Sequence, residues 1–182
     1  KLLRSSSTIR YIAARYIQPK PPRIDSGAVF NLTVHLIDIL NFILKERPTT
    51  VLCKAGFKVG RGGLEDCATV ILGYGDFYAY LEVASLHPFK VRDMFILATD
   101  EAYYADFYNQ RLEVYEKAGE EEWKKREVEV KKVEPLKEEL RHFVLSASGS
   151  VDDNLGEEEI YTTLICEKAL ESFKLGRELR VA

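Results

Sequence analysis

The apolar and polar positions of this 182-residue chain follow two different periods. Alternation with a period of two is typical of half-buried strands, and it predicts a strand over Thr8–Gln18. The same alternation predicts seven further strands, at Thr50–Val59, Asp66–Gly73, Asp76–Ser85, Val91–Thr99, Ala102–Tyr108, Arg111–Glu116 and Arg126–Val133. Because no helical pattern separates these seven segments, we expect an antiparallel meander.

Three segments have the period of a helix: Gly27–Lys45, Pro135–Ala147 and Glu157–Leu175. The first has apolar residues on every side, which predicts a buried helix, and Asp25 or Ser26 would cap it. The expected fold class is α+β, a large, mainly antiparallel, open-faced sheet with helices packed on one face.

Composition narrows the class of protein. Hydrophobic residues make up 46% of the chain, which suits a folded domain, and a net charge of −3 argues against nucleic acid as a partner. The three cysteines lie far apart, so we expect no metal site and no disulfide framework but reduced thiols in the cytoplasm. The longest apolar stretch contains Asn31, His35 and Asp38 and is too polar for a membrane span.

Sequence motifs for common phosphate and nucleophile sites are missing. The only glycine cluster, at 60–63, lies between two expected strands and reads as a turn. A dinucleotide fingerprint or a P-loop would instead place glycines between a strand and a helix. The sequence also contains no G-x-S-x-G nucleophile elbow.

The informative feature is a polar stripe on the first helix. Asn31, His35 and Asp38 are spaced i, i+4 and i+7, which places them on one face. An imidazole exchanges protons near neutral pH, and a neighbouring carboxylate or amide can orient it, so the stripe suits general acid/base catalysis. The alternative is a core histidine that is satisfied by its neighbours, with Asn31 and Asp38 tying adjacent segments together.

Six segments together resemble one enzyme family. Asp25–Asp38 is similar to the segment with the motif G-x-x-x-D-x-x-x-H-x-x-D in the glucose–fructose oxidoreductase / inositol dehydrogenase / rhizopine catabolism (Gfo/Idh/MocA) family. The remaining matches follow in the family's order, with the segment before Pro88 similar to its sugar-nucleotide dehydrogenase branch: Glu65–Leu72, Glu82–Arg92, Asp106–Gln110, Glu134–Phe143 and Ser172–Arg177.

The resemblance implies that residues 1–182 form a single C-terminal substrate and oligomerisation domain. The N-terminal Rossmann domain, which would bind NAD or NADP, is absent from this chain. The chain alone is therefore expected to bind no cofactor and to be inactive. In the complete enzyme, His35 would remove the proton of a sugar or sugar-nucleotide hydroxyl while hydride leaves the same carbon. Asn31 stands where the family usually has Asp, and Asp38 could compensate.

The resemblance also suggests partners. Lys90 and Arg92 follow a proline turn and could bind a substrate phosphate, with Arg15 and Arg23 as weaker candidates, although all four could equally be solvent-facing charges. A homo-oligomer through the sheet face is expected, and the candidates for its apolar outer face are Val70, Leu72, Tyr78, Tyr80, Phe95 and Leu97. The alternatives are a non-catalytic dimerisation or ligand-binding domain of the same fold and, more distantly, an unrelated open-sheet binding domain.

Overall fold

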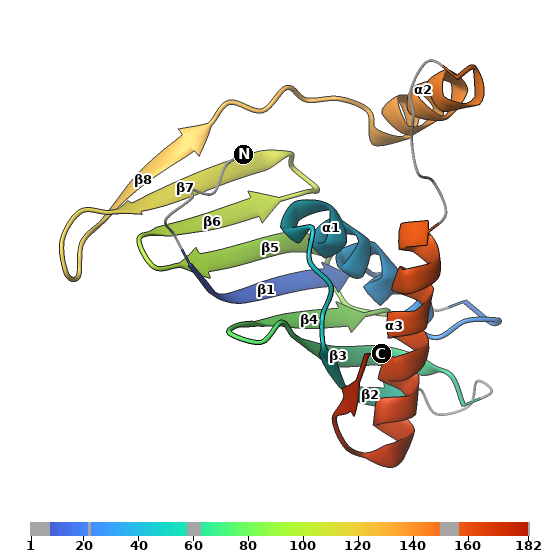
Figure 1. The fold of residues 1–182 in the computed structure, drawn as a ribbon. Helices are drawn as coiled ribbons and strands as arrows, with labels where there is room; N and C mark the ends of the chain where they lie inside the picture. The colour runs from blue at the N-terminus through green and yellow to red at the C-terminus, as the bar shows by residue number, and fades with distance from the viewer. Residues whose placement is uncertain (1–7, 22, 58–62, 150–156, 182) are drawn as a thin grey trace.

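The computed structural model describes residues 8–21, 23–57, 63–149 and 157–181. Its centre is one nine-stranded sheet with the order β8-β7-β6-β5-β1-β4-β3-β2-β9 (Figure 1). The strands are β1 Ile9–Ile17, β2 Thr50–Phe57, β3 Glu65–Gly73, β4 Tyr78–Ala84, β5 Val91–Ala98, β6 Glu101–Asp106, β7 Arg111–Lys117, β8 Trp123–Val128 and β9 Leu179–Arg180. The expected open, mainly antiparallel sheet is confirmed.

One pairing departs from a simple meander. β1 lies between β4 and β5, parallel to β4 and antiparallel to β5, with Tyr16 opposite both Val83 and Arg92. The local alternation of a strand cannot reveal which distant strand will pair with it. The first strand of the chain therefore becomes a central strand of the sheet.

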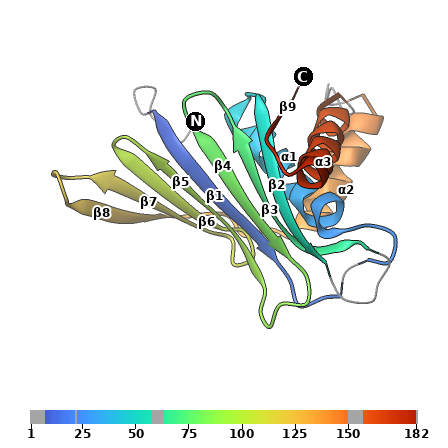
Figure 2. The same cartoon turned by 90° about the horizontal axis from the view of Figure 1, so that it is seen from below.

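Two of the helices cover one face of the sheet, and the opposite face is open (Figure 2). The first helical segment is a π-helical turn, η1 Val29–Thr33, followed by α1 Val34–Leu44. The others are α2 Pro135–Ala147 and α3 Glu157–Leu175. α3 packs on β2 and against α1, and the core between helices and sheet includes Leu36, Ile37, Leu40, Ile165 and Ala169.

The prediction that the first helix is buried on every side is wrong. Phe42 is 71% exposed and Ile43 is 40% exposed. Only one side of α1 faces α3 and the sheet, and hydrophobicity alone cannot show what covers a face. The predicted cap is also wrong: the carboxylate of Asp25 pairs with Arg23, and no side chain of the preceding residues caps the helix.

The last strands differ from their predicted bounds. β8 ends at Val128, whereas the alternation predicted a strand over Arg126–Val133. Residues beyond Val128 leave the sheet, and the side chain of Gln110 binds the backbone N–H and C=O of Val133 in place of a neighbouring strand. β9, a two-residue strand beside β2, was not predicted, and the glycine turn at 60–63 lies largely outside the described residues.

The open face of the sheet carries part of the expected apolar set. Tyr78, Tyr80, Phe95 and Leu97 are exposed or half-buried there, and the ring of Tyr11 packs on those of Tyr78 and Phe95. Val70 and Leu72 were wrong candidates for this face, because both are completely buried in the core on the helix side.

Candidate functional site

His35 lies on the exposed side of α1 and is not sealed in the core. Its ring stacks on that of Tyr16 from β1, with a centroid separation of 5.3 Å and an interplanar angle of 18°. Asp38 is exposed and Asn31 is half-buried. His35 and Asp38 both lie on the exposed side of α1, whereas Asn31 lies in the π-helical turn before it. Tyr16, which sequence reasoning missed, is the ring on which His35 stacks.

A positive charge lies close to the imidazole. The guanidinium carbon of Arg92 is 4.1 Å from the centre of the Tyr16 ring. Partial burial of the His35 ring and the nearby Arg92 lower the pKa of His35 below its ordinary value, while Asp38 raises it. His35 is thus held in its neutral form, which can accept a proton, to a lower pH than a free imidazole.

Asp38 also connects α1 to α3. Thr162 of α3 is buried, and its hydroxyl oxygen accepts a hydrogen bond from the side-chain amide of Asn41 at 3.1 Å. The same hydroxyl lies 3.5 Å from a carboxylate oxygen of Asp38. Asp38 is therefore both a charge near His35 and part of the helix–helix contact.

Lys90 and Arg92 lie at the same end of the sheet as the Tyr16–His35 pair. The ammonium of Lys90 is 4.1 Å from the centre of the Tyr108 ring. Desolvation and the neighbouring Arg92 and Lys20 lower the pKa of Lys90, so the three cations repel one another. The Nε of Arg92 is buried and has no hydrogen-bond partner in the described part of the chain.

Arg15 and Arg23 are engaged elsewhere. Arg15 forms a two-point contact with Asp93, including a hydrogen bond of 2.9 Å from its Nε. Since successive residues of a strand face opposite sides, Arg15 lies on the other face of the sheet from Tyr16. Arg23 binds the exposed carboxylate of Asp25 with bonds of 2.8 and 2.7 Å.

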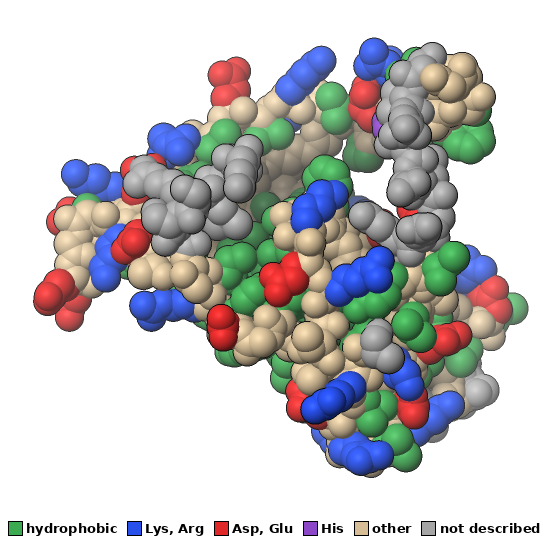
Figure 3. All heavy atoms as spheres, viewed as in Figure 1, with side chains coloured by type: hydrophobic (Ala, Val, Ile, Leu, Met, Phe, Trp, Pro, Cys, Tyr) green, Lys and Arg blue, Asp and Glu red, His purple; other side chains and the backbone are tan. Residues whose placement is uncertain are grey.

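An apolar groove of about 730 Å³ lies between the end of α1 and strands β5 to β7, where Figure 3 shows hydrophobic side chains gathered. Phe42 and Ile43 of α1 form one wall. Met94, Ile96, Tyr103 and Leu112 form much of the sheet side. The groove continues the exposed face of α1, because Phe42 is two turns after His35.

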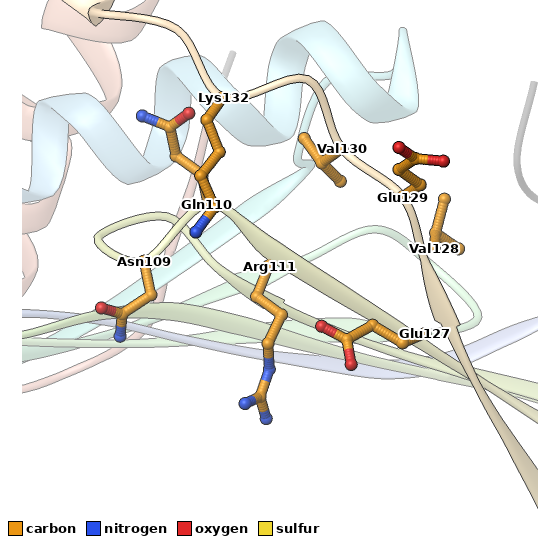
Figure 4. A pocket seen from close by; sticks show the side chains of 8 residues that line it. All are labelled: Asn109, Gln110, Arg111, Glu127, Val128, Glu129, Val130 and Lys132. Atoms are coloured by element: carbon orange, nitrogen blue, oxygen red, sulfur yellow. The ribbon is translucent and has the colours of Figure 1, made fainter.

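A second hollow of about 450 Å³ separates β7 from the segment that leads to α2 (Figure 4). Gln110 forms one end and fastens this segment through the two hydrogen bonds to Val133. Asp106 shapes the turn before it by accepting hydrogen bonds from the backbone and side-chain amides of Asn109. This part of the Asp106–Gln110 motif therefore shapes the connection to α2.

The described residues contain no group of three His, Cys, Asp or Glu side chains that could hold a metal ion. The start of the first helix is also not free to bind the phosphates of a dinucleotide. The helix that follows β1 begins at Val29, and its N–H is already taken by the carboxylate of Glu65 at 3.0 Å. A pyrophosphate could not use this helix start in the way that dinucleotide-binding folds do.

Fold and site together define an open-sheet domain with a titratable side chain exposed on its first helix. The chain belongs to the Gfo/Idh/MocA family: the pattern of the GFO/IDH/MocA C-terminal domain matches residues 6–119, well over half of the chain. No curated protein sequence matches this chain.

Solved structures with low sequence identity share the fold. UDP-N-acetylglucosamine 3-dehydrogenase from Acidithiobacillus ferrooxidans is 20% identical, with a TM-score of 0.74 over 92% of this chain and 53% of its own. Levoglucosan dehydrogenase in complex with NADH is 13% identical, with a TM-score of 0.82 over 96% of this chain and 59% of its own. The chain therefore spans little more than half the length of these proteins.

Proposed function

We propose that this chain is the substrate domain of an NAD(P)-dependent dehydrogenase in which His35 removes the proton of a sugar hydroxyl. The observation that carries the proposal is the exposed imidazole of His35, stacked on Tyr16 with its pKa lowered by partial burial and by Arg92. A neutral imidazole open to solvent is a suitable general base near neutral pH. Asp38 would favour the imidazolium that forms.

A nicotinamide held by another domain would accept the hydride from the same carbon. Two sugar dehydrogenases among the similar structures, one of them in complex with NADH, support this class of reaction.

Lys90 and Arg92 would bind a negatively charged part of the substrate. Two observations support this role. Arg92 lies near the base and has a buried Nε without a hydrogen-bond partner in the described part of the chain, and Lys90 is close enough to Arg92 for the two cations to repel each other. A phosphate-bearing sugar or a sugar nucleotide would offer the charge-assisted hydrogen bonds that they lack. Arg15 and Arg23 are left outside the proposed site because Asp93 and Asp25 engage them.

An N-terminal nucleotide-binding domain would cover the exposed apolar surface beside the base. α2 has no buried residue, and Leu136, Leu140, Phe143 and Val144, which share one side, are each more than half exposed. Phe42 and the apolar groove are further exposed apolar surface that such a domain would cover. The shorter span of this chain, relative to its structural neighbours, agrees with a further domain.

The test is His35→Asn in the full-length protein, assayed with a panel of sugars and nucleotide sugars in the presence of NAD or NADP. Turnover should fall by about 100-fold or more, the range expected for loss of a general base, whereas dinucleotide affinity should not change. His142→Asn is the matched control, because His142 lies on the exposed side of α2 away from its apolar stripe. Unchanged turnover in His35→Asn would instead favour the non-catalytic alternative.

We also propose a cytoplasmic protein. All three cysteines are free, as in reducing compartments. None of the described helices is both long and apolar enough to cross a membrane.

A further inference from the structure

Glu65 is a carboxylate that sequence reasoning did not connect to the site. It lies at the start of β3, is only 5% exposed, and its Oε1 accepts the backbone N–H of Val29 at 3.0 Å. Val29 is the first residue of the π-helical turn that precedes α1. Since no cap comes from Asp25 or Ser26, Glu65 supplies from another strand the acceptor that the helix start lacks.

Gly27 makes this contact possible. A Cβ at position 27 would overlap the carboxylate of Glu65, so a side chain there would force the carboxylate away from Val29. The backbone oxygen of Gly27 also accepts the N–H of Asn31 at 2.9 Å. Gly27 and Glu65 come from two separate motifs of the sequence, and the carboxylate of Glu65 occupies the space that a side chain at position 27 would fill.

Physical chemistry explains what the contact does. The first N–H groups of a helix have no intrahelical acceptor and carry partial positive charge, so a carboxylate there stabilises the start of the helix. A π-helical turn is uncommon and must be held by its surroundings. Asn31 lies inside this turn, and His35 is the second residue of the α-helix that follows.

We propose that Glu65 is a positioning residue, which acts through the N–H of Val29 and the space left by Gly27 to hold the Asn31–His35 side of the helix against Tyr16. Any catalytic consequence rests on the proposed function. The placement of His35 does not rest on the proposed function. The experiment therefore measures where the His35 ring lies and does not measure turnover.

The experiment is an NMR titration of the 182-residue chain, whose only histidines are His35, His87 and His142. Glu65→Ala should loosen the helix start, expose the His35 ring and move it away from Tyr16. The pKa of His35 should then rise toward its ordinary value of 6.5, and its ring protons should lose the shift caused by the Tyr16 ring. The ring-proton shifts of His87 and His142 should match those of the wild-type chain.

Three further variants separate positioning from general loss of stability. Glu65→Gln should keep the wild-type titration of His35, because the amide oxygen can accept the same N–H. Gly27→Ala should shift His35 in the same direction as Glu65→Ala, and it decides the question if Glu65→Ala does not fold. Glu101→Gln removes another buried carboxylate, on β6, and should leave His35 unchanged.

Three results would overturn the proposal. One is a wild-type titration of His35 in folded Glu65→Ala or Gly27→Ala. The second is a shift in Glu65→Gln as large as in Glu65→Ala, since the hydrogen bond would then not be the link. The third is an equal shift in Glu101→Gln, which would make the effect one of general destabilisation. If His35 later proves not to be the base, these results still stand, since none depends on turnover.

Discussion

Asn31 is a residue at which this chain departs from the motif that it resembles. A carboxylate at this position would lie one helical turn before His35, whereas the amide of Asn31 carries no charge. Of the two charged side chains near the imidazole, Asp38 raises the pKa of His35 and Arg92 lowers it. The basicity of His35 is accordingly lower than the usual motif would give.

Asn31→Asp should raise the pKa of His35, because a carboxylate one turn away favours the imidazolium form. The measurement is the NMR titration of His35 in the 182-residue chain. Asn109→Asp is the control, because Asn109 lies in the turn between β6 and β7, and it should leave His35 unchanged. A pKa of His35 that stays the same or falls in Asn31→Asp would show that position 31 does not face the imidazole.

A buried carboxylate of β7 links this strand to its neighbour β8. Glu113 of β7 is only 3% exposed and contacts Lys125, Tyr115 and Arg111. Hydrogen bonds from Lys125 and Tyr115 and the charge of Arg111 lower the pKa of Glu113 to about 2, against the desolvation that opposes them. The ionised carboxylate thus stabilises the uncovered end of the sheet.

Glu113→Gln should lower the free energy of unfolding at neutral pH. A carboxyl group with a lowered pKa stabilises the folded state above its unfolded pKa, and this contribution is lost as the pH falls toward the folded value. The difference in the free energy of unfolding between wild type and variant should therefore shrink as the pH falls from about 4.5, the ordinary pKa of Glu, to about 2. Denaturant unfolding across this range measures it.

Glu116→Gln is the control for this prediction. Glu116 lies on the same strand, and its side chain is 41% exposed and 3.9 Å from Arg126. The Glu116→Gln substitution should change the free energy of unfolding only slightly at every pH, because most surface ion pairs contribute little. A Glu113→Gln variant as stable as wild type at neutral pH would contradict the account.

The periodicity of the sequence predicted where helices and strands lie better than it predicted which segments pack against them. Buried positions alternate along most of β3 and β4, and the predicted bounds of both strands were nearly correct. The parallel pairing of β1 with β4 and the end of β8 depend on contacts between distant segments, which no local pattern contains.

In the candidate site too, the sequence predicted some features and missed others. The spacing of His35 and Asp38 predicted that they share a side of the helix, and both are exposed on α1, because a helical period relates them. Tyr16, Tyr108 and Glu65 reach the site from other strands and turns, so only the folded chain brings them there.

The two faces of the sheet suit two different partners. The helix side carries His35, the cations and the apolar groove, whereas the open face carries the cluster of Tyr11, Tyr78 and Phe95. We propose that this open face joins two copies of the chain, because exposed aromatic residues are typical of interface cores.

Tyr78→Lys should weaken self-association, since a lysine ammonium would lose its hydration in an apolar contact. Light scattering across a range of concentrations measures the mass. Ile24→Lys is the control, because Ile24 is 87% exposed but lies in the loop between β1 and the first helix. A wild-type chain that remains monomeric at all concentrations, or a Tyr78→Lys variant that associates equally well, would contradict the proposed interface.

The most direct test of the central claim is the pH dependence of kcat/KM in the full-length protein, measured for the wild type and for His35→Asn. Because the pKa of His35 is lowered, the wild-type rate should fall on the acid side only below the ordinary histidine value of 6.5. The variant should be slow at every pH and should lack this fall. A variant with the wild-type profile and rate would show that His35 is not the group that accepts the proton.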